Sequence, residues 1–123
     1  ENLPRIVVDR IMIEQVLLNL IKNGIESMHD TPFDRRRLSI SARQIDERLL
    51  QVDIADNGHG LPAEDVEKIF APFYTTKQEG MGIGLAICRS IIEFHQGHLW
   101  VEARHEGGTV FRFTVPIEES DDE

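Results

Sequence analysis

The sequence predicts an α/β domain, a two-layer α/β sandwich in which a mixed, mostly antiparallel sheet carries helices on one face. Two observations support this fold class. Apolar residues recur at intervals of three and four over residues 9–28 and 83–96, which predicts two amphipathic helices. Runs of alternating apolar and polar residues, separated by turn residues, predict the following strands: 38–43, 50–56, 99–103 and 109–115.

Composition limits what kind of protein this is. A chain of 123 residues with 41% hydrophobic residues is long enough for one core and too short for two. The formal net charge of -9 argues against nucleic acid as a partner, because a phosphate backbone is repelled by an acidic surface. No apolar run reaches the length of a membrane span and no signal-peptide pattern opens the chain, so we expect a soluble, cytoplasmic domain. Cys88 is the single cysteine and agrees with a reducing compartment.

The first predicted helix follows a short strand-like run from Pro4 to Val8, with Asp9 as its N-cap. Its expected core-facing stripe consists of the following residues: Ile13, Val16, Leu17, Leu20, Ile21 and Ile25. On another face, Asn19 and Asn23 follow Gln15 at intervals of four. Side chains four apart lie within about 6 Å, so the two asparagines are able to address one small object. A solvent-exposed polar face is the alternative interpretation.

Asp56 ends the next predicted hairpin, whose turn is Asp46-Glu47-Arg48. By parity it continues the buried row of Leu50, Val52 and Ile54, and a buried carboxylate is costly unless something hydrogen-bonds to it. The glycines at 58 and 60 suggest a side-chain-free gap for a flat ligand, and an adenine amine would donate to the carboxylate. A turn that merely ends a strand is the alternative. The basic run 35–37 is expected to be a solvated loop.

The segment from 61 to 81 is predicted to contain a short helical piece that stops at Pro72, followed by a mobile loop with the character of a lid. This loop carries Thr75, Thr76 and Lys77. Its glycine-rich end, Gly80-Met81-Gly82-Ile83-Gly84-Leu85, leads into the second helix, which we expect to begin at Ile83 or Gly84. Free N–H groups and the dipole at a helix N-terminus favour a phosphate.

The two last strands flank a turn at Glu106-Gly107-Gly108, and Thr109 shares parity with Phe111 and Phe113, so its hydroxyl is expected to enter the core layer. We expect the domain to span residues 1–117 and residues 118–123 to form an acidic, disordered tail.

Two familiar phosphate-binding motifs do not fit these glycines. A Walker loop needs a lysine and a hydroxyl directly after its second glycine, and a dinucleotide fingerprint needs its glycines straight after a strand. Four stations, in this order and spacing, instead resemble the ATP-binding domain of sensor histidine kinases, which has the Bergerat fold. They are the following segments: Asn19 to Asn23, Asp56 to Gly60, Gly80 to Leu85, and Gly108-Thr109.

The resemblance covers Pro4 to Pro116 and implies roles for individual residues. Asn23 would hold Mg²⁺, Asn19 would lie by the metal and phosphates, and Asp56 would bind the adenine amine of ATP. The remaining implied nucleotide contacts are the base-bordering Gly58, Gly60 and Leu61, the phosphate-closing Thr75, Lys77, Gly80, Gly82, Ile83, Gly84 and Leu85, and Thr109, which would reach the adenine through water.

Asn19 also separates this chain from the ATP hydrolases of the same fold, which carry a water-activating glutamate at that position. An amide cannot accept a proton from water, so the resemblance implies phosphoryl transfer. Gly24 departs from the family's usual alanine and is expected to loosen the helix by roughly 1 kcal/mol.

The resemblance further implies a partner domain. Histidine kinases carry the phosphorylated histidine on a separate helical dimerisation domain, and none of the chain's five histidines lies in such a context; we assign them no role. The expected partners are that helical domain and a response regulator receiver domain. The parent protein is expected to be a homodimer, and the resemblance is compatible with a parent with or without a membrane anchor. Three alternatives remain open: a serine kinase of the anti-sigma-factor type, an ATP hydrolase of the same fold, and a non-enzymatic, nucleotide-gated interaction module.

Overall fold

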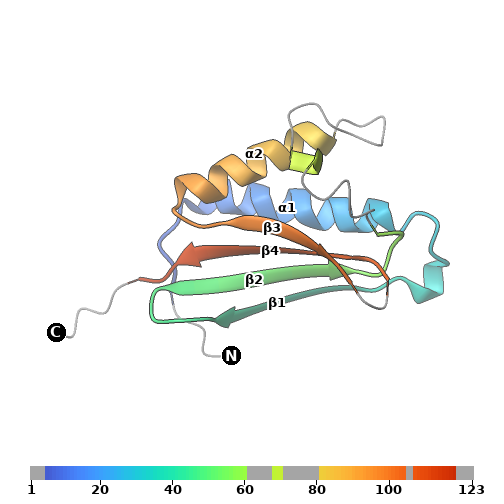
Figure 1. The fold of residues 1–123 in the computed structure, drawn as a ribbon, viewed down its shortest axis with the longest axis horizontal. Helices are drawn as coiled ribbons and strands as arrows, with labels where there is room; N and C mark the ends of the chain where they lie inside the picture. Colours follow the sequence, from blue (N-terminus) through green and yellow to red (C-terminus); the bar gives the residue numbers. More distant parts are fainter. Residues whose placement is uncertain (1–4, 61–67, 71–80, 105–106, 119–123) are drawn as a thin grey trace.

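The computed structural model describes residues 5–60, 68–70, 81–104 and 107–118, and these form a two-layer sandwich (Figure 1). A four-stranded sheet has the order β1-β2-β4-β3, and helices α1 and α2 lie together over one of its faces. Every pairing among these four strands is antiparallel. The helix bounds are α1 Arg10–Ser27 and α2 Met81–Phe94, with short 3-10 turns η1 Phe33–Arg35 and η3 Lys68–Phe70; the strands are β1 Leu38–Gln44, β2 Leu49–Asp56, β3 Leu99–Ala103 and β4 Thr109–Pro116.

Helix α1 starts where the sequence predicts. The Asp9 side chain accepts a hydrogen bond from the Met12 N–H at 3.0 Å and so caps the helix. The expected core stripe is wrong at one position, because Ile25 is 50% exposed while Gly24 and Ser27 are buried. Small residues turn inward here because β1 and the loop after β2 approach this end of the helix closely. A periodicity of large apolar residues does not predict that small residues such as Gly24 and Ser27 are buried.

The core lies between the helices and the inner face of the sheet. Its largest fully buried side chains include Phe111, Phe113, Leu20 and Ile54. The expected strand over Pro4 to Val8 is only an isolated bridge between Ile6 and Ile117 within the part described. Glu118 still donates its N–H to the Arg5 carbonyl at 2.7 Å, whereas the rest of the predicted tail lies outside the described residues.

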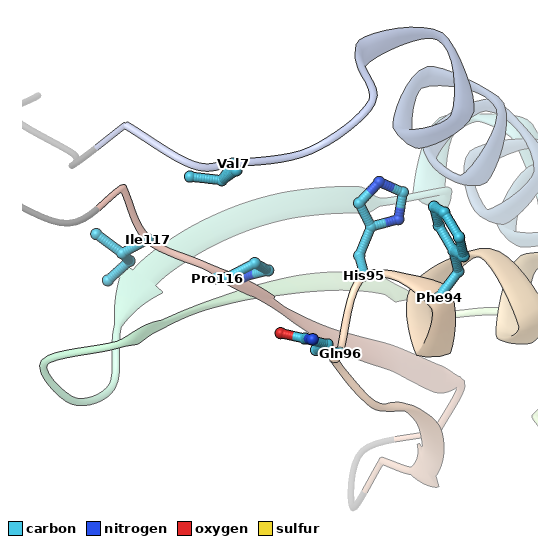
Figure 2. A pocket seen from close by; sticks show the side chains of 6 residues that line it. All are labelled: Val7, Phe94, His95, Gln96, Pro116 and Ile117. Carbon is cyan, nitrogen blue, oxygen red and sulfur yellow. The ribbon is translucent and has the colours of Figure 1, made fainter.

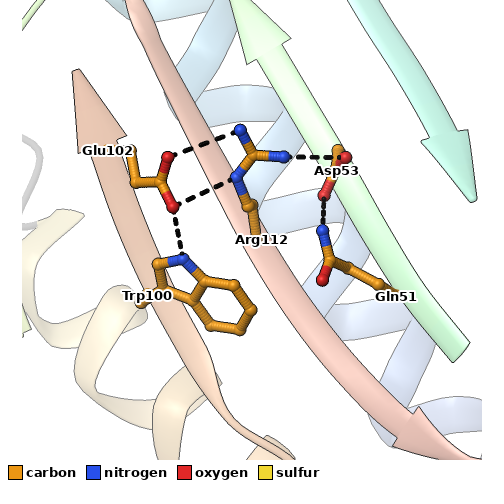
Figure 3. Close-up of polar contacts among 5 residues, drawn as sticks. All are labelled: Gln51, Asp53, Trp100, Glu102 and Arg112. Atoms are coloured by element: carbon orange, nitrogen blue, oxygen red, sulfur yellow. Dashed lines mark hydrogen bonds and ion pairs between the residues drawn. The ribbon is translucent and has the colours of Figure 1, made fainter. Parts of the chain in front are cut away.

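The outer face of the sheet carries a polar cluster rather than a second helix layer (Figure 3). Arg112 on β4 makes an ion pair with Asp53 on β2 at 3.0 Å and another with Glu102 on β3 at 3.4 Å. Glu102 accepts a hydrogen bond from the Trp100 indole at 2.8 Å, and Gln51 donates to Asp53 at 2.9 Å. These side chains link three strands, although Arg112 Nε, which lies 3.4 Å from Glu102, makes no hydrogen bond within the described part of the chain. Among the described helices, none combines the length and the apolarity that crossing a bilayer requires.

Candidate nucleotide-binding site

The carboxylate of Asp56 is buried at the end of β2, on the face covered by the helices. Its residue exposure is 2%, as the strand parity predicts. Oδ1 accepts the Gly58 N–H at 2.8 Å, and Oδ2 has no hydrogen-bond partner among the residues that the structure describes. The residue is almost fully buried, and Oδ2 is left without a donor from these residues. Asp56 is therefore able to accept a hydrogen bond from a ligand at this oxygen.

Three elements surround this carboxylate. Leu38 on β1 and Thr109 on β4 are its direct cross-strand neighbours, and Gly24 of α1 lies opposite. A Cβ atom on Gly24 would be 3.6 Å from Asp56 Oδ2 and only 2.7 Å from Leu38 Cδ1. Thr109 is 4% exposed, which confirms that its side chain enters the core layer. The structure thus brings Asp56, Thr109 and the C-terminal half of α1 together.

The loop after Asp56 packs against the end of α1. A Cβ atom on Gly58 would collide with the Ser27 carbonyl, and that carbonyl accepts the His59 N–H at 3.1 Å. The expected ligand gap at Gly58 is therefore wrong, because the protein backbone fills it. Gly60 has a φ of 81° and lies beside Gly108, so this loop reaches the turn that leads into Thr109.

Asn57 fixes the segment that follows η1. Its Oδ1 accepts the Arg37 N–H at 2.9 Å and its Nδ2 donates to the Arg35 carbonyl at 2.8 Å. The middle arginine of the basic run is not simply solvated, because Arg36 donates to the carbonyls of Thr31 and His29. These bonds give the basic run a structural role beside the Asp56 loop.

The two asparagines lie one turn apart on α1, and Asn19 faces α2. Asn19 is half-buried, and its Nδ2 donates to Cys88 Sγ on α2 at 3.6 Å. Asn23 is also half-buried, and its amide forms no hydrogen bond within the described part of the chain. The alternative interpretation of a solvent-exposed polar face does not hold for Asn19, because Asn19 contacts α2.

Helix α2 begins at Met81, two residues before the predicted start. Gly82 and Gly84 consequently belong to its first turn, where backbone N–H groups lack helical partners. A Cβ atom on Gly84 would lie 3.8 Å from Asn19 Oδ1. The start of α2, with its free N–H groups, is therefore adjacent to the Asn19 amide.

Some of the predicted nucleotide contacts lie outside the part of the chain that the structure describes. They are Leu61, Thr75, Lys77 and Gly80, together with the side chain of Ile83. Leu85 is 4% exposed and packs in the core.

The amide oxygens of Asn19 and Asn23 suit a Mg²⁺ ion that binds together with a nucleotide. In the part of the chain described, no three His, Cys, Asp or Glu side chains form a metal cluster. A self-sufficient protein site is therefore not seen there. Mg²⁺ accepts oxygen ligands and commonly keeps waters and substrate phosphates in its shell, so amide oxygens of Asn23 and Asn19 suit it.

A separate cavity of about 410 Å³ lies where α2 ends and the chain enters α1 (Figure 2). Its lining includes His95, whose Nε2 accepts the Asp9 N–H at 2.9 Å and whose Nδ1 lies 2.8 Å from the Ile91 carbonyl. With these partners, Nδ1 carries the proton and donates it. The histidine joins the two helices and does not belong to the Asp56 site.

Sequence reasoning missed three residues of this site. Cys88 contacts Asn19, and Gly24 with Leu38 covers Asp56. The available signals were weak: Cys88 falls on the same helical stripe as Leu85 and Ile92, and Gly24 directly follows Asn23. The helical stripe does not predict that Cys88 contacts Asn19, and the position of Gly24 after Asn23 does not predict that it covers Asp56.

Comparison with known proteins gives one family. The family model of histidine kinase-, DNA gyrase B- and HSP90-like ATPases matches residues 8–119. The sensor protein FixL of Bradyrhizobium diazoefficiens is 40% identical over 111 residues, which is 90% of this chain and 22% of FixL. The C4-dicarboxylate transport sensor protein DctS of Rhodobacter capsulatus is 42% identical over 116 residues, 94% of this chain and 18% of DctS. The chain thus spans about a fifth of these relatives.

Solved structures agree. The catalytic domain of the histidine kinase ThkA superimposes with a TM-score of 0.77 at 40% identity, covering 89% of this chain and 69% of that one. Full-length ShkA in complex with AMPPNP gives a TM-score of 0.80 at 26% identity, covering 96% of this chain and 24% of ShkA. The similar domain in ShkA belongs to a chain solved with an ATP analogue.

Proposed function

Because the chain belongs to the family of histidine kinase-, DNA gyrase B- and HSP90-like ATPases, as the ATP-binding domain of a sensor histidine kinase, we propose that it binds Mg-ATP between α1, Asp56 and the start of α2. The observation that carries the proposal is the buried Asp56 carboxylate with Oδ2 unpartnered. An adenine amine would donate to it, whereas guanine would present a carbonyl oxygen there. One carboxylate is thus able to select the base.

In the parent protein, we propose, the γ-phosphoryl group of this ATP passes to a histidine of a separate helical domain and then to a response regulator. Relatives named as sensor proteins and sensor histidine kinases support this reading and do not favour the serine kinase, the hydrolase or the non-enzymatic module. Asn19, where hydrolases of this fold carry a glutamate, points the same way.

Mg²⁺ would be held by the Asn23 amide oxygen, with Asn19 beside it, and would supply charge neutralisation at the phosphates. The chain's own groups do the rest: Asp56 orients the base, and the N–H groups at the start of α2 face the phosphates. Thr75, Lys77 and Gly80 belong to the same proposal as residues that close over the phosphates. So does a cytoplasmic location, with which the free buried thiol of Cys88 agrees.

Titration calorimetry tests the base assignment. We expect Mg-ATP to bind the unmodified chain and Mg-GTP to bind at least tenfold more weakly. Asp56→Asn should weaken Mg-ATP binding about 10- to 100-fold, since a hydrogen bond to a charged acceptor contributes about 1.5–3 kcal/mol. The matched control is Asp53→Asn, which removes a carboxylate from the outer face of the same strand and should leave affinity unchanged. Equal loss in both variants would contradict the assignment.

A further inference from the structure

The contact between Asn19 and Cys88 joins the two helices at the phosphate end of the site. Asn19 Nδ2 donates to Cys88 Sγ at 3.6 Å. Cys88 is fully buried on the core stripe of α2, whereas Asn19 is half-buried. Since the sulfur is fixed in the core and the amide lies at its edge, the thiol constrains the amide more than the reverse.

An asparagine amide presents chemically opposite ends. Its NH₂ group donates and its oxygen accepts, so a half-turn of the amide exchanges the two. With Nδ2 on the sulfur, Oδ1 is the end of the amide left to accept from or bind another group. The amide faces Gly84 in the first turn of α2, where a Cβ atom would lie 3.8 Å from Oδ1 and 3.9 Å from Nδ2. Mg²⁺ binds the oxygen of an amide and is repelled by its NH₂ group. The orientation of this one amide therefore decides whether Asn19 favours or opposes the metal.

We propose that Cys88 is a positioning residue for phosphoryl transfer, which holds the Asn19 amide with its oxygen toward the metal and phosphates. The proposal rests on the proposed function, because it needs a metal-bound nucleotide at this end of α1. Cys88 touches neither the nucleotide nor the metal and acts only through Asn19.

The chemical state of the thiol suits this role. Burial raises the pKa of Cys88 to about 11, against a smaller opposing effect of the Asn19 hydrogen bond. The sulfur is therefore uncharged at neutral pH. A thiolate would attract the metal and an adjacent charge would alter the phosphate site, whereas a neutral thiol offers only a weak acceptor to Nδ2.

Three variants separate positioning from packing. Cys88→Ser keeps an acceptor at this position, Cys88→Ala removes it, and Cys88→Val removes it while filling the volume. The readout is the ratio of ATP affinities with and without Mg²⁺, measured by calorimetry on the full chain. We expect the ratio to fall about two- to tenfold in the alanine and valine variants, the worth of one modest hydrogen bond, and to stay near the unmodified value in the serine variant. ATP affinity without Mg²⁺ should change in none of them.

A second readout needs no nucleotide. The side-chain NH₂ resonances of Asn19, assigned by their loss in Asn19→Asp, should shift in Cys88→Ala and Cys88→Val and less in Cys88→Ser. Unchanged Mg²⁺ dependence in both acceptor-free variants would overturn the proposal, even if their melting temperatures fall. Failure of the unmodified chain to bind ATP would instead overturn the proposed function, and the positioning role with it.

Discussion

Asp53 and Asp56 lie three residues apart on β2, on opposite faces of the sheet, and the chain treats them differently. Asp53 faces outward, where Arg112 and Gln51 satisfy its two oxygens at 3.0 Å and 2.9 Å. Asp56 faces the helices, is more deeply buried, and receives one N–H on Oδ1 and no bond on Oδ2 from any described residue. The more deeply buried carboxylate is thus the one that the fold leaves with one oxygen unpaired. Such a group indicates a binding site more reliably than its residue type does.

The largest effect expected from this comparison is a difference in the free energy of unfolding between two variants. Asp56→Asn should stabilise the nucleotide-free chain by about 1 to 2 kcal/mol, because it removes a buried charge that lacks a full set of partners. Asp53→Asn should destabilise it by about 1 kcal/mol, because it breaks a half-buried ion pair. Urea denaturation of the two variants measures both values. A destabilised Asp56→Asn would show that the carboxylate contributes to folding and not only to binding.

Cys88 is a second buried ionisable group, and burial disfavours its charged form by raising its pKa. Its folded pKa of about 11 exceeds the ordinary value of 9.0, so the stability it contributes is present below pH 9 and is lost as the pH rises toward 11. Between pH 8 and pH 10 the unmodified chain should lose about 1 kcal/mol more than Cys88→Ser. Denaturant midpoints at both pH values measure this difference. Equal losses in the two chains would mean that the thiol ionises in the folded state as it does in water.

The sequence predicts the strands and helix caps better than it predicts which side chains from distant parts of the chain contact one another. The hairpin at Asp46, the inward parity of Asp56 and Thr109, and the Asp9 cap all depend on local patterns, and all are present. Local patterns also place Asn19 and Asn23 on one helix face. They cannot state that α2 supplies Cys88 as the partner of Asn19, because that contact joins residues 69 positions apart.

The errors have a common physical cause. The sequence predicts that Ile25 faces the core and that Gly58 leaves a ligand gap. In the structure, the end of α1 turns Gly24 and Ser27 inward, and the Ser27 carbonyl occupies the space at Gly58. Close approach of backbones selects small residues, and a hydrophobic periodicity counts only large ones. The four stations were nonetheless sufficient to predict the family, since each combines a residue type with a fixed position on its element.

The smallest expected effect concerns Gly24, which lies against Asp56 and has no counterpart near Asp53. An alanine here should gain up to about 1 kcal/mol in helix propensity. Its Cβ atom would lie 2.7 Å from Leu38 Cδ1, so this gain is offset by displacement of the leucine, and Gly24→Ala alone should change stability by less than about 0.5 kcal/mol. Shortening the leucine removes the conflict: in a Leu38→Val background the same substitution should stabilise the chain by about 1 kcal/mol. A double-mutant cycle measured by urea denaturation gives this coupling. Additive effects would show that Leu38 does not limit the space at Gly24, and that the glycine is explained by the approach to Asp56 alone.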